Sequence, residues 1–357
     1  MTASLAQLAE VPYRPSRPKS YAPRIGMIGC GGITREHLRA YRAAGFQLTA
    51  LCDVQLPRAR AAAEEFYPQA DVYEDYRELL RDESIEVVDV TTHPAERLAI
   101  IDAALRADKH VLSQKPFVLN LDDGERLIEL AEQCGKVLAV NQNGRWAPHF
   151  SYARQAASSG CLGDVFAAHL GCHWDHSWVA GTAFEKVKHL ILYDYAIHWF
   201  DIVRCFFAPK PPRRVFASTA RVPGQNLQPQ LLGQALIEFE EGQATLAFDA
   251  GVPHGQLDQT YLAGTLGSLH SRGPSIQQQQ LTLTTAQGSW SPALHGQWFP
   301  DAFQGTMGEV LCAIEERREC SINARDNLHS LALCFAAVAS AERGQAVIPG
   351  SIRQLPT

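Results

Sequence analysis

Short apolar segments alternate with helical segments along the first part of this chain, and this alternation constrains the fold more than any other feature. The predicted strands are Arg24 to Ile28, Gln47 to Cys52, Val87 to Thr91, His110 to Leu112 and Val137 to Val140, and the predicted helices are about Thr34 to Ala44, Ala95 to Ala107 and Leu121 to Cys134. Strands that alternate with helices in this way form a parallel sheet covered on both faces. We therefore expect an α/β domain with a doubly wound parallel sheet over residues 24–145.

The pattern changes after residue 145. A strand is predicted from Val165 to His173, a helix from about Tyr193 to Cys205, and mostly β structure from Arg214 to about Leu283, where Glu240-Glu241-Gly242 favours a hairpin turn. Two helices, at about residues 302–317 and 324–343, follow. Residues 146–350 are therefore expected to form an α+β domain with a large, mostly antiparallel sheet that binds substrate and mediates oligomerisation.

Length and charge exclude several classes of protein. A chain of 357 residues is long enough for about two domains. The 32 basic and 38 acidic residues give a net charge of −6, which does not attract nucleic acid or anionic membranes. Residues 1–23 contain four prolines and are predicted to form an extended arm, either as a disordered tail or packed on a partner subunit.

The cysteines indicate a reducing environment. The nine cysteines are odd in number and never form a Cys-x-x-Cys pair, which argues against a disulfide framework and favours the cytoplasm. The longest apolar stretch, around Leu331 to Ala341, is much shorter than the ~20 residues of a membrane span.

A glycine-rich turn follows the first predicted strand. Gly29 and Gly31 lie between that strand and a helix, where glycines permit a tight turn and a close approach of the backbone to a pyrophosphate. Thr34 occupies the third glycine position of the usual fingerprint and is small enough for the helix and strand to approach. The expected contacts of this turn with a dinucleotide are Gly29, Cys30, Gly31, Gly32, Ile33 and Thr34. Residues 24–145 are thus predicted to be a Rossmann dinucleotide-binding domain.

An acidic residue follows the second predicted strand. Asp53 lies 22 residues after Gly31, where a carboxylate accepts hydrogen bonds from the adenosine ribose diol and repels a 2′-phosphate. We therefore expect NAD as the cofactor. Arg58 and Arg60 lie nearby and leave NADP as the less favoured alternative.

Two further motifs extend the pattern. Lys109-His-Val-Leu-Ser-Gln-Lys115-Pro116 ends a predicted strand, and Asp194-Tyr-Ala-Ile-His198-Trp-Phe-Asp201 lies on a predicted helix. Together with the glycine turn and His37, the chain resembles the Gfo/Idh/MocA family of NAD(P)-dependent oxidoreductases over nearly all of residues 24–350. That family includes inositol dehydrogenase and glucose-fructose oxidoreductase.

The resemblance implies specific roles. It identifies Lys115, Asp194 and His198 as catalytic residues, adds Thr92, Gln114, Lys115 and Asn143 to the cofactor site, and implies a cis Lys115–Pro116 bond, homodimers or homotetramers, and no metal. Two residues depart from the family pattern. Gln114 stands in place of the usual glutamate, and Arg97 stands where relatives often have histidine.

The chemistry of these residues suits alcohol oxidation. A proton must leave oxygen as hydride leaves carbon, and histidine, with an ordinary pKa near 6.5, suits the general base, so His198 is the candidate. Asp194 lies four residues earlier, on the same face of the predicted helix, where it can contact substrate hydroxyls. Lys115 can stabilise the developing negative charge on the reacting oxygen.

The stretch from His169 to Trp178 is rich in aromatic residues and potential metal ligands. A zinc site is one interpretation, but alternation along a strand places His169 and His173 on the face opposite Cys172 and Trp174. A sugar-binding pocket is favoured instead. The expected substrate contacts are Arg145, Trp146, His173, Trp174, Asp175, His176, Trp178, Asp194 and His198, with His189 as a further candidate.

Three functions are compatible with these residues. The favoured one is an NAD-dependent oxidoreductase that transfers hydride between a secondary alcohol of a sugar, cyclitol or polyol and nicotinamide. A glycoside-cleaving enzyme that oxidises, eliminates and re-reduces with tightly bound NAD is the alternative, and a non-enzymatic nucleotide-sensing regulator is the third. An apolar dimer surface is expected at Leu236, Phe239, Leu246 and Phe248.

Overall fold

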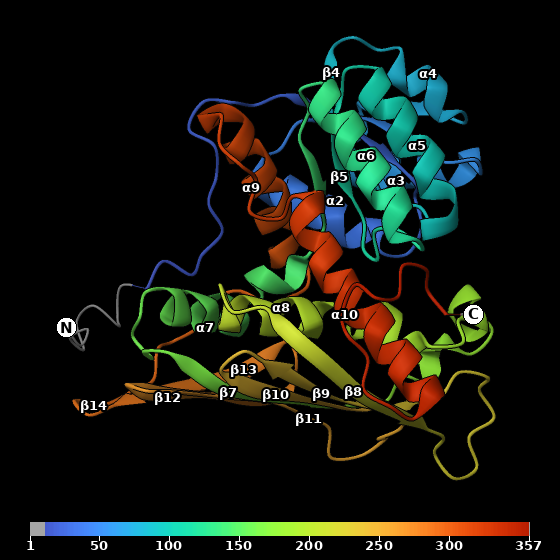
Figure 1. Cartoon of the computed structure of the whole chain (residues 1–357). Coiled ribbons are helices and arrows are strands. Elements are labelled where there is room, and N and C mark those ends of the chain that lie inside the picture. Colours follow the sequence, from blue (N-terminus) through green and yellow to red (C-terminus); the bar gives the residue numbers. More distant parts are fainter. Residues whose placement is uncertain (1–10, 357) are drawn as a thin grey trace. The chain divides into compact units, whose positions relative to one another are not determined.

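The computed structural model describes residues 11–356, which divide into two compact units (Figure 1). The first, called here the parallel-sheet unit, comprises Pro15–Trp146 and Phe299–Leu328. The second, the large-sheet unit, comprises Ala147–Trp298, the chain from His329 onward, and residues 11–14. Residues 299–328, which the sequence pattern assigned to the second domain, thus lie in the parallel-sheet unit.

The parallel-sheet unit contains a six-stranded sheet of order β3-β2-β1-β4-β5-β6 in which every neighbouring pair is parallel. Its strands are β1 (Arg24–Ile28), β2 (Leu48–Cys52), β3 (Asp71–Tyr73), β4 (Ile85–Val90), β5 (His110–Ser113) and β6 (Leu138–Val140). This order confirms the predicted doubly wound Rossmann sheet. The strand order reverses between β1 and β4, and the carboxyl ends of those strands are where this fold binds nucleotides.

Helices flank this sheet. They are α2 (Thr34–Ala44), α3 (Leu56–Phe66), α4 (Tyr76–Leu80), α5 (Pro94–Arg106), α6 (Leu121–Gln133) and α9 (Asp301–Glu316). The sequence pattern placed α2, α5, α6 and α9 to within a few residues but did not identify α3, β3 or α4. The three residues of β3 and five of α4 are too few to show a clear hydrophobic period.

The described part of the N-terminal arm is held by its own chain. The Glu315 carboxylate on α9 accepts hydrogen bonds from the backbone N–H groups of Lys19, Ser20 and Tyr21 at 2.6 to 2.8 Å. These bonds lower the pKa of Glu315 to about 2. Residues 19–21 are therefore held in place on their own chain, and residues 1–10 lie outside the described part.

The large-sheet unit is built on an eight-stranded sheet of order β14-β13-β12-β11-β7-β10-β9-β8. Its strands are β7 (Val165–His173), β8 (Pro212–Ala220), β9 (Leu232–Phe239), β10 (Gly242–Asp249), β11 (Leu257–Gly264), β12 (Gly267–Ser275), β13 (Gln278–Thr285) and β14 (Gly288–Trp290). β7 and β10 pair in parallel, and the other neighbouring pairs are antiparallel. The predicted β9–β10 hairpin is confirmed, with Gly242 at a φ of 139° in its turn.

Helices cover one face of this sheet (Figure 1). They are α7 (Pro148–Ser158), α8 (Ile197–Phe207) and the later part of α10 (Ala324–Arg343). Phe207 of α8 stacks on Phe239 of β9 with ring centroids 3.9 Å apart. Phe239, Leu246 and Phe248 are buried on this covered face, so their expected place in a dimer surface was wrong. Strand alternation leaves Leu236 on the opposite face, 37% exposed.

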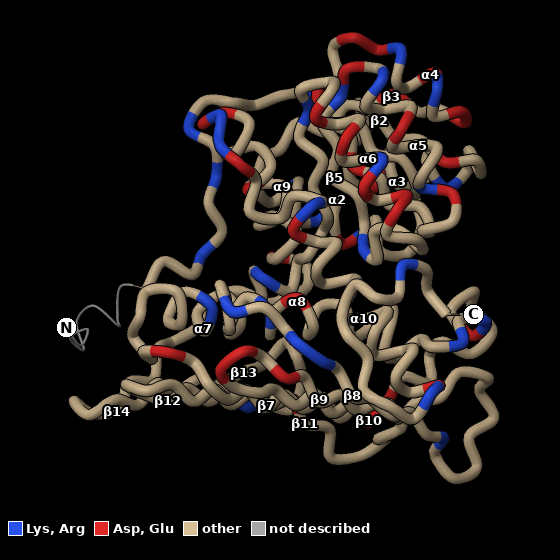
Figure 2. Tube along the Cα trace, in the orientation of Figure 1, with Lys and Arg blue, Asp and Glu red and all other residues tan. Residues whose placement is uncertain are grey.

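The surface carries both signs of charge. Lysines and arginines lie interspersed with aspartates and glutamates over both units (Figure 2). Within residues 11–356, the helices are too short or too polar to span a membrane.

Candidate functional site

The turn between β1 and α2 lies close against the end of β4. Gly29 has a φ of 99°, and a Cβ there would lie 2.9 Å from Thr91 Oγ1 and 3.0 Å from the backbone nitrogen of Thr92 at the end of β4. Thr34 is buried, and its hydroxyl contacts the Gly29 carbonyl and Thr91 Oγ1, both at 3.0 Å. The threonine thus joins the turn to β4 at the position where the fingerprint usually has glycine.

The other two glycines of the turn face open space. A Cβ on Gly31 or Gly32 would meet no atom within 4 Å. Ile33 is the residue immediately before α2, and its side chain forms no hydrogen bond with the first turn of the helix. The side chain of Ile33 therefore does not occupy the positive end of the helix. An open cradle at a helix N-terminus fits a dinucleotide pyrophosphate, as predicted for Gly29 to Thr34.

Asp53 lies directly after β2 with its carboxylate against this turn. Its Oδ2 accepts the backbone N–H of Cys30 at 2.7 Å, and its Oδ1 accepts that of Gln55 at 2.8 Å. Burial, with Asp53 nearby, raises the pKa of the Cys30 thiol to about 12, so the thiol stays protonated. Each carboxylate oxygen retains acceptor capacity, which suits the predicted bonds from a ribose diol.

The turn that carries Lys115 lies beyond β5. The Lys115–Pro116 bond is cis, as the resemblance implied. The buried Arg97 guanidinium donates to three carbonyls, those of Thr92, Gln114 and Pro116. Arg97, which departs from the family pattern, therefore joins the end of β4 to both sides of Lys115.

A buried polar network lies beneath this turn. His37 Nδ1 contacts Asp89 Oδ2 at 2.7 Å, and His37 Nε2 contacts the amide nitrogens of Gln114 at 3.0 Å and Asn141 at 3.1 Å. The Tyr41 hydroxyl donates to the same Asp89 oxygen at 2.6 Å. Sequence reasoning missed Asp89, although an acidic residue within a fully buried strand is itself a signal of a buried partner.

Asp194 and His198 lie on two different helical segments. Asp194 belongs to a π-helical turn, Ile191–Tyr195, and His198 to α8, so the single predicted helix was wrong at its start. The Ala196 N–H donates to the Ile191 carbonyl five residues back, at 2.8 Å. Single π-turns are frequent at functional sites because they re-aim side chains. His198 is buried, and its ring lies edge-on to Trp298 with centroids 5.4 Å apart.

An aromatic cluster surrounds His176 after β7. The indole N–H groups of Trp174 and Trp178 both donate to His176 Nδ1, at 2.8 and 3.2 Å. Trp174 stacks on Tyr195, next to Asp194, with centroids 4.1 Å apart and an interplanar angle of 18°. Because indoles only donate, His176 Nδ1 accepts. Trp178 is 58% exposed.

Other predicted substrate residues lie elsewhere. His173 pairs with Asp249 at 2.7 Å on the open face of the large sheet, whereas Cys172 contacts Tyr195 at 3.4 Å on the covered face. His173 is therefore separated from Asp194 and His198 by the sheet, and its contact with substrate stays a prediction. Asp175 lies in the loop after β7, where its carboxylate accepts the Ser177 N–H, which lowers the pKa of Asp175.

Three more candidates have internal partners. Arg145 donates to the Ser321 carbonyl and to the Asp326 carboxylate, and the buried Trp146 packs against Gly305. His189 contacts Glu342 at 2.9 Å, and burial lowers the pKa of His189 despite this carboxylate. These contacts favour structural roles. Asn143 is buried in the 3-10 turn Asn143–Trp146.

The potential metal ligands among residues 11–356 do not lie close together. Within residues 11–356, groups of three or more His, Cys, Asp or Glu side chains placed to hold a metal are not found. His169 contacts Thr245 at 2.7 Å on the open face, apart from Cys172 on the covered one.

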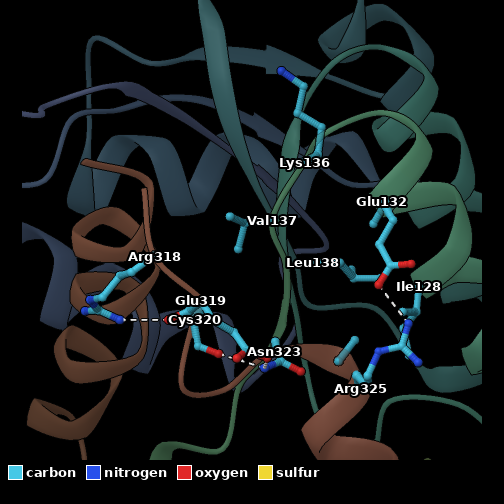
Figure 3. Close-up of a pocket in the computed structure, with 12 residues that line it drawn as sticks. Ile128, Glu132, Lys136, Val137, Leu138, Arg318, Glu319, Cys320, Asn323 and Arg325 are labelled. Atoms are coloured by element: carbon cyan, nitrogen blue, oxygen red, sulfur yellow. Dashed lines mark hydrogen bonds and ion pairs between the residues drawn. The ribbon is translucent and has the colours of Figure 1, made fainter. Parts of the chain in front are cut away.

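A separate cavity of about 190 Å³ lies between α6, β6 and the start of α10 (Figure 3). Its charged residues pair with one another or with neighbours: Arg325 with Glu132 at 2.7 Å, Arg318 with Glu309 at 2.7 Å, and Lys136 with Asp108 at 2.8 Å. These paired charges make the cavity a weaker candidate for a ligand site than the glycine turn.

Known proteins are similar to this chain in sequence and in fold. Residues 23–142 match the model of the oxidoreductase family with an NAD-binding Rossmann fold, and residues 150–270 match the GFO/IDH/MocA C-terminal domain. D-apiose dehydrogenase of Paraburkholderia graminis is 27% identical over 90% of this chain and 88% of its own. The 1,5-anhydro-D-fructose reductase of Ensifer adhaerens is 27% identical over 90% of this chain and 97% of its own.

A solved structure agrees in fold. An oxidoreductase from Agrobacterium radiobacter, in complex with NAD+, L-tartaric acid and magnesium, superposes with a TM-score of 0.83 at 22% identity, over 92% of this chain and 99% of its own. The two matched family models together cover more than half of the sequence. The chain therefore belongs to the GFO/IDH/MocA family of oxidoreductases, with an NAD-binding Rossmann fold at its N-terminal end.

Proposed function

We propose that the protein is an NAD-dependent dehydrogenase that oxidises a secondary alcohol of a sugar, cyclitol or polyol. The observation that carries this proposal is the position of Lys115. Arg97 fixes its turn to the end of β4, and β4 also packs against the glycine turn. A lysine is thereby held after β5, next to the end of β4, and β4 is one of the two strands at the strand-order reversal where this fold binds the dinucleotide. The named activities of the relatives, on apiose and on anhydrofructose, support the substrate class.

In this proposal His198 and Lys115 act on the substrate carbinol, and Asp194 acts on a neighbouring hydroxyl. His198 accepts the hydroxyl proton as general base. Lys115 donates a hydrogen bond to the same oxygen and stabilises the charge that develops on it. Asp194 accepts a hydrogen bond from a neighbouring hydroxyl and orients the ring. NAD, when bound, supplies the hydride acceptor at C4 of the nicotinamide.

The aromatic cluster after β7 suits the ring of such a substrate. The exposed Trp178 can stack on sugar C–H groups, and the Asp175 carboxylate lies in the same loop, bonded to the Ser177 N–H. Because its Nδ1 accepts from both indoles, a neutral His176 carries its proton on Nε2.

The proposal includes assembly and location. We propose a homodimer or homotetramer formed through the open face of the large sheet, where Leu236, Phe216 and Tyr261 are each at least 37% exposed. Thiols such as Cys52 and Cys320 are buried and not in disulfides, which supports a reducing cytoplasm.

A substrate screen tests the activity. Inositols, aldoses, other polyols and glycosides are mixed with NAD or NADP, and reduced cofactor is followed by absorbance. We expect NADH to accumulate with at least one polyol, and Lys115→Ala and His198→Ala to lower kcat by orders of magnitude with NAD affinity nearly unchanged. Full turnover in either variant would remove the mechanism. Release of sugar without NADH would instead support the glycoside-cleaving cycle, and binding of NAD without turnover of any compound would support a regulator.

A further inference from the structure

The network beneath Lys115 is completely buried and has defined donors and acceptors. His37 and Asp89 have no exposed surface, and Gln114 and Asn141 are at most 5% exposed. Groups buried this deeply are mostly paired with one another, because water cannot replace a missing partner; in this network Asp89 Oδ1 and Asn141 Oδ1 are the atoms left without one. Their protonation therefore follows from which atoms face each other.

The contacts place one proton on His37. Burial, together with Asp89, raises the pKa of Tyr41 well above its ordinary value, so its hydroxyl keeps its proton and donates to Asp89 Oδ2. The same oxygen faces His37 Nδ1, which must also donate. At the other side of the ring, Nε2 faces the amide nitrogens of Gln114 and Asn141, which only donate. His37 is therefore a neutral imidazole with its proton on Nδ1.

The orientation of the Gln114 amide is fixed by Lys115. Gln114 Oε1 accepts the backbone N–H of Lys115 at 2.7 Å, so the oxygen cannot exchange places with the nitrogen that faces His37. Arg97 meanwhile holds the carbonyls on either side of Lys115. Gln114 thus holds the backbone N–H of Lys115, and Arg97 holds the carbonyl groups of the residues before and after it.

We propose that Gln114 is a positioning residue for Lys115, and that its amide holds the lysine backbone by joining it to a neutral His37 anchored on Asp89. The inference rests on the proposed function only for the catalytic role of Lys115. It assigns a purpose to the glutamine that stands where the family usually has glutamate.

A glutamate in place of Gln114 would require a different proton count. Its carboxylate could still accept the Lys115 N–H, but it could not donate to His37 Nε2. The imidazole would have to take a second proton and lie between two carboxylates. The glutamine removes this need.

Among the described residues, the charged or titratable groups that contact His37 are Asp89 from β4 and Tyr41 from α2. Phe303 from α9 and Asn141 also contact His37 and are uncharged.

Nitrogen NMR of the full chain labelled at histidine tests the proton count without an activity assay. In the wild type, we expect His37 to show one protonated ring nitrogen, Nδ1, and one unprotonated nitrogen, Nε2, with a His37→Gln variant to assign the signals. In Gln114→Glu, both His37 nitrogens should be protonated near neutral pH. A doubly protonated wild-type His37, or a proton on Nε2, would overturn the proposal.

Kinetics test the positioning role. Gln114→Leu removes the hydrogen bonds of the amide to His37, to the Lys115 N–H and to Asn141, and we expect kcat to fall about tenfold or more. Gln114→Glu keeps the acceptor for Lys115. Its kcat should therefore stay closer to that of the wild type than the kcat of Gln114→Leu does. Asn120→Ala is the control, because it removes only the cap of α6 and should lower the melting temperature while kcat is kept.

The two proposals fail in different ways. If Gln114→Leu keeps full turnover while Lys115→Ala loses it, the positioning role is overturned and the proposed function remains. If Lys115→Ala keeps full turnover, the proposed function fails, whereas the His37 spectrum still reports whether the network has the inferred protonation.

Discussion

At the residue scale, Asp258 on β11 is a buried acid that the proposed mechanism does not use. It is 1% exposed, and its Oδ1 accepts the Gln279 side-chain N–H at 2.9 Å. Burial raises its pKa from an ordinary 3.8 to about 7, while a hydrogen bond with Cys172 opposes this rise. The folded chain therefore binds the Asp258 proton more tightly than the unfolded chain. The protonated Asp258 therefore stabilises the folded chain. This contribution to the free energy of unfolding is fully present below about pH 4 and is lost as the pH rises through about 7.

Replacing this acid should flatten the pH dependence of stability. We expect the melting temperature of the wild type to fall between pH 6 and pH 9, and that of Asp258→Asn to fall less, because the amide cannot ionise and can still accept from Gln279. Thermal unfolding across this pH range measures the difference. The exposed Asp164→Asn should keep the wild-type slope, and an unchanged slope in Asp258→Asn would contradict the shifted pKa.

Asp53 is the residue that we propose determines the choice between NAD and NADP. Removing it in Asp53→Ala should raise the NADH Kd by about 10- to 100-fold, as expected for loss of charged hydrogen bonds, and should move the preference toward NADPH. Fluorescence titration with both cofactors measures this. Tighter binding of NADPH than NADH by the wild type would show that Asp53 does not have the assigned role.

At the element scale, the β1–α2 turn uses its glycines for two different reasons. Gly29 adopts a positive φ and lies against the end of β4, so a side chain there is excluded by the chain itself. Gly31 faces open space, so the chain itself leaves room for a side chain there, and we propose that the glycine is needed for the close approach of the dinucleotide.

A pair of alanine variants separates these reasons. Gly29→Ala should lower the free energy of unfolding by about 1 to 3 kcal/mol or more, because the backbone conformation is strained and the Cβ meets Thr91 and Thr92. Gly31→Ala should leave stability within about 1 kcal/mol of wild type and reduce NADH affinity strongly. Denaturant unfolding and NADH titration of both variants distinguish the cases, and equal NADH affinity in Gly31→Ala and wild type would argue against a pyrophosphate at this turn.

At the scale of the whole molecule, the open face of the large sheet carries a row of side chains that are in register across six strands. The row consists of Phe216, Leu236, Thr245, His169, Tyr261 and His270. Its apolar and aromatic members leave hydrophobic surface uncovered, with Phe216 48% and Tyr261 44% exposed. A continuous stripe of this kind suits a self-complementary contact between two copies.

A charge within this row should weaken assembly. We expect Leu236→Asp to shift the protein toward the monomer mass in light scattering at micromolar concentration, because two buried carboxylates would face each other or remain unpaired. Leu119→Asp is the matched control, since Leu119 is 39% exposed, close to the exposure of Leu236, but lies just before α6, outside the large sheet. A wild-type monomer under these conditions would contradict the proposed assembly.

The sequence by itself determined the features that depend on local periodicity. The strand–helix alternation of residues 24–140, the β9–β10 hairpin and the glycine turn were all predicted, because each is specified by residues close in the chain. Tertiary structure decided the features that depend on distant residues. Which face of the sheet holds Phe239 and His173, and which carbonyls Arg97 binds, follow from strand register and packing. Likewise, His37, Asp89 and Gln114 come from three separate elements, and only folding brings their donors and acceptors together, out of reach of water, so that each must satisfy the others.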